Sequence, residues 1–67
     1  MTVIHAVQNS VAFAYSVVET AKLIGVSRSK IYELFDRGEL TYLKIGRRTL
    51  IERSAIERLL AAHRTGE

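Results

Sequence analysis

The sequence predicts a mostly α-helical domain that carries one small β-hairpin. Three observations lead to this prediction. Two segments with apolar residues at three- and four-residue intervals flank a short turn that holds a glycine and a serine. A stretch of threonine, tyrosine and aliphatic residues then turns back on itself at a later glycine. A third segment with helical spacing follows and ends near the last residues of the chain.

The first predicted helix begins after Ser16. Ser16 and Glu19 have the three-residue spacing of a capping box, in which the hydroxyl accepts from a free backbone N–H and the carboxylate reaches back. Gly25 can adopt the left-handed conformation that closes a helix. The apolar face of this helix consists of Val17, Val18, Ala21 and Ile24.

The second predicted helix follows after about two residues, because Ser27 offers an N-cap directly after Val26. Gly38 ends it, and Arg37 lies near its negative end. Its apolar face consists of Ile31, Leu34 and Phe35.

A helix, a tight turn and a second helix form the helix-turn-helix unit, whose second helix enters the major groove of DNA by its N-terminal end. Helical projection puts Ser29, Glu33 and Asp36 opposite the apolar face, with Lys30 and Tyr32 on the flanks. Phosphate would repel the two acids if the whole helix lay along the groove, so we expect end-on insertion. Glu33 could also accept a hydrogen bond from a cytosine amino group. The predicted major-groove residues are Ser27, Arg28, Ser29, Lys30 and Tyr32.

The predicted hairpin has strands at residues 40–44 and 49–51 and a turn at residues 45–48. Its apolar positions for packing on the helices are Leu43, Ile45, Leu50 and Ile51, and the pattern does not assign which of them face inward. The basic tip predicts a wing, with one arginine in the minor groove and another on phosphate. The alternative is a solvated turn. The predicted wing residues are Lys44, Gly46, Arg47, Arg48 and Thr49.

The last predicted helix starts near Ser54, which has capping-box spacing to Glu57. We expect it to close the core over the first two helices, and residues 65–67 to form a frayed end. Its apolar face consists of Ile56, Leu59 and Leu60, with Ala62 or His63.

Residues 1–14 have no charged side chain and form a predicted N-terminal extension. Two interpretations stay open for this extension: a loosely packed leader, or an arm that buries its apolar residues against a neighbouring subunit or a partner. His5 has no companion ligand nearby and His63 lies far along the chain, so we expect neither a metal site nor a cofactor.

The composition limits the class of protein. Sixty-seven residues without cysteine suit one small domain without disulfides or thiolate metal sites. No apolar run approaches the ~20 residues that span a bilayer, so we expect a soluble cytoplasmic protein that binds no membrane. The serines are explained as caps or turn residues, and catalysis is not expected. The net charge of +3 favours a polyanionic partner, since eight of the ten basic residues lie in residues 22–53.

The run YSVVETAKLIGVSRSKIYELFDRGELTYLKIGRRTLIERSAIERLL, from Tyr15 to Leu60, resembles the excisionase family. These small DNA-binding domains are winged helix-turn-helix modules related to the MerR type. The resemblance rests on the capped first helix with Ala21, then GVSRSKIY, GEL, a hairpin through IGRR and a helix of the RSAIERLL kind. It implies a winged helix-turn-helix domain over residues 15–64 that binds double-stranded DNA by the second helix and the wing.

Three functions remain in competition. The resemblance implies a recombination directionality factor, which binds adjacent sites near an attachment site of a prophage or integrative element and bends the DNA, so that a partner integrase excises. It equally implies a small transcription regulator. A protein-interaction adaptor without DNA binding is the third. Because a single module buries only about 600–1,000 Å² on DNA, we expect a homo-oligomer or a cooperative array, and the lack of a sensor domain inclines the prediction towards excision.

Overall fold

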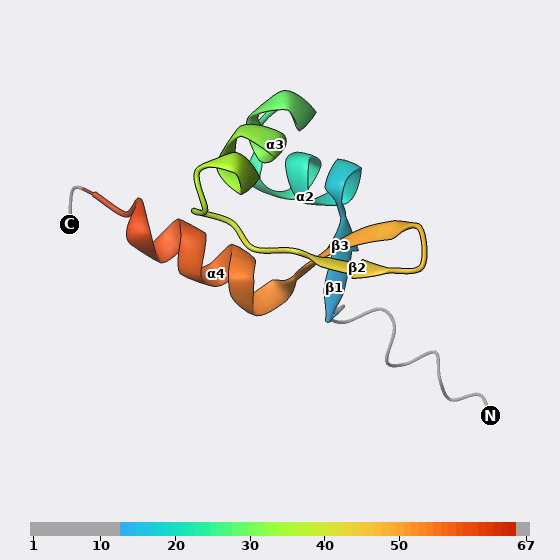
Figure 1. Ribbon diagram of the computed structural model, residues 1–67. Helices are drawn as coiled ribbons and strands as arrows, with labels where there is room; N and C mark the ends of the chain where they lie inside the picture. Colours follow the sequence, from blue (N-terminus) through green and yellow to red (C-terminus); the bar gives the residue numbers. More distant parts are fainter. Residues whose placement is uncertain (1–12, 66–67) are drawn as a thin grey trace.

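The computed structural model, shown in Figure 1, describes residues 13–65. The elements in chain order are β1 (Ala14–Ser16), α2 (Val17–Ile24), α3 (Arg28–Asp36), β2 (Leu43–Ile45), β3 (Arg48–Glu52) and α4 (Arg53–Ala62). Three helices and a small antiparallel sheet confirm the predicted class, a winged helix-turn-helix. None of the helices within this range is long and apolar enough to cross a bilayer.

The predicted start and end of α2 are both confirmed. The Ser16 hydroxyl accepts from the Glu19 backbone N–H at 3.1 Å, and the Ser16 N–H donates to the Glu19 carboxylate at 2.8 Å. Gly25 then adopts a φ of 76°, and its N–H donates to the Ala21 carbonyl at 2.9 Å. The left-handed residue stops the helix and redirects the chain into the turn.

The limits of α3 are also confirmed. The Ser27 hydroxyl accepts from the Lys30 N–H at 3.0 Å, which satisfies one of the free donors at the helix start. Arg37 is the last residue with helical dihedral angles, and Gly38 follows with a φ of 74°. The beginnings and ends of α2 and α3 are therefore fixed by hydrogen bonds and backbone conformations of residues at most a few positions apart.

The hairpin of β2 and β3, called the wing below, is confirmed with different limits. Ile45 pairs with Arg48, so only Gly46 and Arg47 form the turn, and the first strand begins at Leu43 instead of residue 40. Gly46 has a φ of 62° at the first turn position, which matches the twist of a two-residue hairpin loop. Leu40 lies outside the strand, because its backbone N–H donates to the Leu34 carbonyl of α3 at 3.3 Å, and its side chain is buried in the core.

A third strand, β1, joins the other edge of β3 and was not predicted. The strand order is β1-β3-β2, and Tyr15 pairs with Ile51 in the antiparallel ladder. Ala14, the last residue of the predicted extension, already pairs with Glu52. Residues 1–12 of that extension lie outside the described residues.

The predicted capping box of Ser54 and Glu57 is wrong. The helix starts one residue earlier, at Arg53, directly after β3, and its N-cap residue Glu52 makes no side-chain cap hydrogen bond. The Arg53 N–H instead donates to the Phe13 carbonyl at 2.8 Å, and the Glu57 carboxylate accepts from the Arg53 side chain at 3.1 Å. The hydrogen bond to Phe13, the residue before β1, thus fixes where α4 begins, and Ser54 lies inside the first turn of α4.

The core lies between the three helices and one face of the sheet. Thr20 is fully buried among apolar side chains, and its hydroxyl donates to the Ser16 carbonyl at 2.8 Å. Of the apolar wing positions, Ile51 faces inward, whereas Leu43 and Ile45 are exposed. The buried apolar residues are Val17, Ala21, Ile31, Leu34, Leu40, Ile51, Ala55, Ile56 and Leu59.

Candidate nucleic-acid interface

The five predicted major-groove residues all lie at the surface around the start of α3. Ser27 is its N-cap and Arg28 its first residue. Because the Ser27 oxygen already accepts from Lys30, its hydroxyl proton is the part left to donate to a phosphate oxygen. The exposed backbone N–H groups and the positive end of the helix dipole favour an anion at this place.

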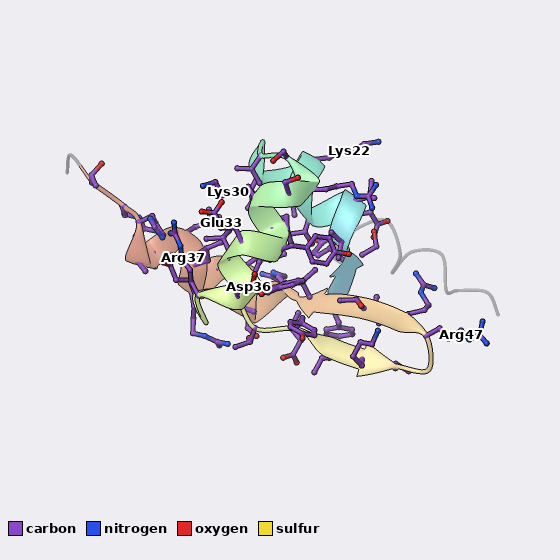
Figure 2. The ribbon with its side chains drawn as sticks, turned by 45° about the horizontal axis from the view of Figure 1, so that its top comes forward. Lys22, Lys30, Glu33, Asp36, Arg37 and Arg47 are labelled. Atoms are coloured by element: carbon purple, nitrogen blue, oxygen red, sulfur yellow. The ribbon has the colours of Figure 1, made fainter. Side chains whose placement is uncertain are left out.

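Lys30 differs from its neighbours because it belongs to a chain of ion pairs. Its ammonium lies 3.2 Å from the Glu33 carboxylate, which also accepts from Arg37 at 2.9 Å. Arg37 reaches Glu39 at 3.4 Å, and Glu39 lies 2.9 Å from the His63 ring. Figure 2 shows Lys30, Glu33 and Arg37 on the side of α3 turned towards α4. The charge of Lys30 is therefore partly neutralised, and that of Glu33 is balanced by two cations.

Of the two acids of α3, the unbalanced one is Asp36. No cation within the described range lies at ion-pair distance from its carboxylate. The expected repulsion of phosphate by the two acids of α3 therefore applies mainly to Asp36, near the C-terminal end of the helix. This charge favours contact with DNA through the opposite end, where Arg28 lies.

A groove of about 370 Å³ separates α3 from the wing and is called the α3–wing groove. Aromatic rings line much of it: Tyr32 meets Phe35 edge to face at a centroid distance of 5.6 Å, and Phe35 meets Tyr42 at 4.3 Å. The structure thus brings Tyr32 of the predicted major-groove set together with two predicted wing residues. The lining residues are Tyr32, Phe35, Asp36, Tyr42, Lys44 and Thr49.

The predicted wing residues divide into two groups. Lys44 and Thr49 are a cross-strand pair, and the Lys44 ammonium donates to the Thr49 hydroxyl at 3.3 Å. Gly46 and Arg47 form the turn itself, and Figure 2 shows Arg47 projecting outward from its tip. The wing therefore offers one cation beside α3 and another at its far end.

Arg48 is the first residue of β3, and its charge acts on Glu19 in the first turn of α2. The backbone N–H and the hydroxyl of Ser16 lower the pKa of Glu19 below its usual 4.5, and the nearby charge of Arg48 lowers it further. Burial acts in the opposite direction on this group. The guanidinium of Arg48 thus adds positive charge where the wing meets the helix-turn-helix unit.

Positive charge is distributed unevenly over the domain. Lys30, Arg37 and Arg53 have carboxylate partners within 4.0 Å. Seven other exposed cations have no carboxylate at that distance among residues 13–65: Lys22, Arg28, Lys44, Arg47, Arg48, Arg58 and Arg64. Uncompensated positive charge therefore lies on α2, at the start of α3 and along the wing, and also on α4 and just after it.

Two exposed residues near the candidate interface, Tyr42 and Lys22, were not among the predicted site residues. Tyr42 lies in the α3–wing groove, and its spacing of two from Lys44 is the signal that puts both on one face of an extended chain. Lys22 is exposed on α2, and Figure 2 shows it at the upper end of the molecule, away from Arg47. A lone lysine in an amphipathic helix carries no signal of its own.

A comparison with protein families gives one match. The family described as a helix-turn-helix domain matches residues 14–64, a range that contains every predicted site residue. The comparisons with curated proteins and with solved structures gave no match. The family match confirms the resemblance to excisionase-type and MerR-like domains that the sequence motifs carry.

Proposed function

We propose, from the premise that the chain belongs to this helix-turn-helix family and is a small DNA-binding protein, that it acts as an excisionase-like recombination directionality factor. In this role several copies bind near an attachment site and bend the DNA, and an integrase is the partner that then excises. Domains of this family typically bind DNA without catalysing a reaction.

The observation that carries the proposal is the uncompensated charge at two separate elements. Arg28 stands at the start of the reading helix, and Arg47 stands at the wing tip. A helix start suits the major groove, and an arginine on a narrow hairpin suits the adjacent minor groove, where the negative potential is strongest. The DNA backbone between the two grooves would then cross the α3–wing groove at Tyr32, one helical turn before Asp36, whose charge repels phosphate.

Within this arrangement the residues have different roles. Arg28 and Ser29 reach base edges, because they lead the helix and are exposed. Tyr32, Lys44 and Thr49 face the backbone that passes through the α3–wing groove, where Lys44 meets phosphate. Ser27 donates to phosphate at the helix start. Lys30 contributes mainly through the field of its ion-paired cluster.

Two considerations favour an architectural role. A module of this size covers a small area of DNA, so useful affinity comes from neighbouring copies that bind cooperatively. The two elements would contact adjacent grooves on either side of one DNA backbone. Such contacts also stabilise bent DNA, because those made in the bent form offset the deformation energy. A small transcription regulator is the alternative, since it needs the same reading helix and wing.

The test is an electrophoretic shift of duplex from the flanks of the protein's own gene, compared with random duplex of equal length, at two salt concentrations. We expect stepwise cooperative shifts on the flanking DNA and weaker, more salt-sensitive shifts on the random duplex. Circular permutation of the flanking site measures the bend. A single complex with unbent DNA at a promoter would favour transcription regulation. If neither duplex shifted at micromolar protein concentration, the protein-interaction adaptor without DNA binding would be favoured.

A further inference from the structure

We propose that Ile45 is an apolar wedge, which enters the minor groove of DNA from the wing, partly separates one base step and so kinks the duplex. The inference rests on the proposed function, because it assigns the bend to a single side chain. Wedges of this kind are large aliphatic or aromatic side chains on proteins that bend DNA through the minor groove. Ile45 has no role in the contacts described above.

The Ile45 side chain is exposed although it lies within a strand. It leaves 60% of its surface exposed, more than any other large apolar side chain of the described range except Phe13. Its backbone is held, because it pairs with Arg48 as the last pair of the ladder before the turn. Only Gly46 and Arg47 lie beyond this pair, and Gly46 has no side chain that could cover Ile45. The wing therefore presents one bare aliphatic side chain close to its tip.

Alternation along the strands separates the two faces of the wing. Lys44 and Thr49 form a cross-strand pair and line the α3–wing groove, so they face α3. Ile45 and Arg48, the next pair, lie on the opposite side, here called the outer face. Under the proposed function, the DNA backbone in the α3–wing groove separates the major groove at α3 from the minor groove at the wing. The outer face is then the face turned into the minor groove.

The charges around Ile45 select DNA as the occupant. Lys44, Arg47 and Arg48 have no carboxylate within 4.0 Å among the described residues. An apolar protein surface that covered Ile45 would take these cations out of water without giving them a partner, which is unfavourable. In the minor groove, sugars and partly unstacked bases lie between two rows of phosphates. DNA thus offers an apolar contact for the isoleucine and anions for the cations beside it.

The thickness of the wing requires the minor groove to open. Side chains stand on both faces of the two strands, and a sheet with its side chains occupies about 10 Å. The minor groove of regular DNA is only about 6 Å wide. The tip therefore enters fully only where the duplex deforms, and an aliphatic side chain inserted between two bases stabilises this opened form. Arg47 projects beyond Ile45 at the tip, as Figure 2 shows, and can reach the groove that stays closed beside the kink.

Only the tip of the outer face enters the groove. Glu52 lies on the same face at the other end of β3, about 13 Å along the strand from Arg48. Because phosphate repels this carboxylate, the DNA stays near the turn. Leu43, two residues before Ile45 on the outer face, is less exposed. Figures 1 and 2 both show the wing tip apart from the helices, so the approach to Ile45 is open.

The test measures preference for a duplex that is already easy to unstack. The probes are two duplexes of about 20 bp with the same arbitrary sequence, one of which carries a central mismatch. Both carry a fluorescence donor and an acceptor at their ends, so energy transfer reports the bend. We expect the unchanged protein to bend both duplexes and to bind the mismatched one about tenfold more tightly, because a mismatch makes insertion easier.

Ile45→Ala removes the wedge without changing the charge of the wing. This variant should lose the tenfold preference and the bend, yet keep the salt dependence of binding to the paired duplex. Ile45→Leu keeps a large aliphatic side chain and should behave like the unchanged protein. Leu23→Ala is the matched control, because Leu23 is similarly exposed, at 56%, and lies in a hollow between α2 and α4. Circular dichroism checks folding, and Ile45→Thr, which keeps the β-branched shape that strands favour, replaces the alanine variant if that variant unfolds.

The possible outcomes separate this inference from the proposed function. If the preference and the bend survived in Ile45→Ala, the wedge would be overturned and the outer face would be left to a protein partner. Equal losses in Leu23→Ala would also overturn it, as would binding of the unchanged protein to both duplexes with equal affinity and no bend. DNA binding itself would stand in each of these cases. Failure of the unchanged protein to bind either duplex at low salt would instead overturn the proposed function.

Discussion

Under the proposed function, recognition of the DNA sequence depends most on Arg28. It is exposed at the first position of α3 and has no carboxylate partner among the described residues. Arg28→Ala should cost about 1–3 kcal/mol of binding free energy on the specific site and relax the base preference there. Arg58→Ala, at an exposed basic residue of α4, is the matched control. Equal losses on specific and random duplex would assign Arg28 to phosphate instead of bases.

Glu39 gives a prediction about pH. The hydrogen bond from His63 holds the pKa of Glu39 below its usual 4.5, against the effect of burial, and Arg37 lowers it further. Because the folded-state pKa is depressed, the interaction stabilises the fold above about pH 4.5 and is lost as the pH falls through the folded-state value. His63→Ala should move the pKa of Glu39 back towards 4.5. Carboxyl chemical shifts measured across a pH titration test this, and an unmoved pKa would exclude the histidine as its main cause.

At the scale of the elements, two serines with the same spacing to a glutamate behave differently. Ser16 caps α2 in a complete capping box, whereas Ser54 lies inside the first turn of α4. Ser16→Ala should lower the free energy of unfolding by about 1 kcal/mol, and Ser54→Ala should change it by less than about 0.5 kcal/mol. Urea denaturation monitored by circular dichroism compares the two. A larger loss for Ser54→Ala would mean that α4 is capped by its serine after all.

The wing gives a prediction about salt. If Arg47 and Arg48 contact DNA, changing both to alanine removes up to two phosphate-neutralising charges. The logarithmic slope of affinity against salt should then fall by about 1–2, with weaker binding to every duplex. Changing Arg58 and Arg64 together is the control, because it lowers the net charge equally at exposed residues of α4 and beyond. If the slope changed equally in both double variants, the two wing arginines would act only through the net charge of the protein and not through contacts with phosphate.

At the scale of the whole molecule, the small core limits stability. Ile31 is fully buried where α3 packs into the core, and a domain of this size has only a few kcal/mol to lose. Ile31→Ala should cost about 2–5 kcal/mol and leave much of the protein unfolded, whereas Ile31→Val should cost about 0.5–1.5 kcal/mol. Thermal unfolding and DNA binding should fail together in the first variant and survive in the second. A folded Ile31→Ala protein without DNA binding would point to a more direct role for this residue.

The sequence by itself determined the features that depend on neighbours within one or two turns. The capping box of Ser16 and Glu19, the left-handed Gly25, the Ser27 cap and the tight turn at Gly46 are all formed by residues close in the chain. Their hydrogen bonds and dihedral preferences act before any tertiary contact, so spacing and residue type suffice to predict them. The same holds for placing Arg28 and Arg47 at exposed positions.

Tertiary structure decided what depends on residues far apart in the chain. The pairing of Tyr15 with Ile51 created the third strand and, through the Phe13 carbonyl, set the start of α4. The arrangement of α3 and α4 placed Lys30 and His63 around one apolar groove and brought Glu39 to His63. A strand of three residues has too little periodicity to predict, and an ion pair or groove shared by distant elements leaves no local pattern. Their positions follow only once the buried side chains have fixed how the helices and the sheet meet.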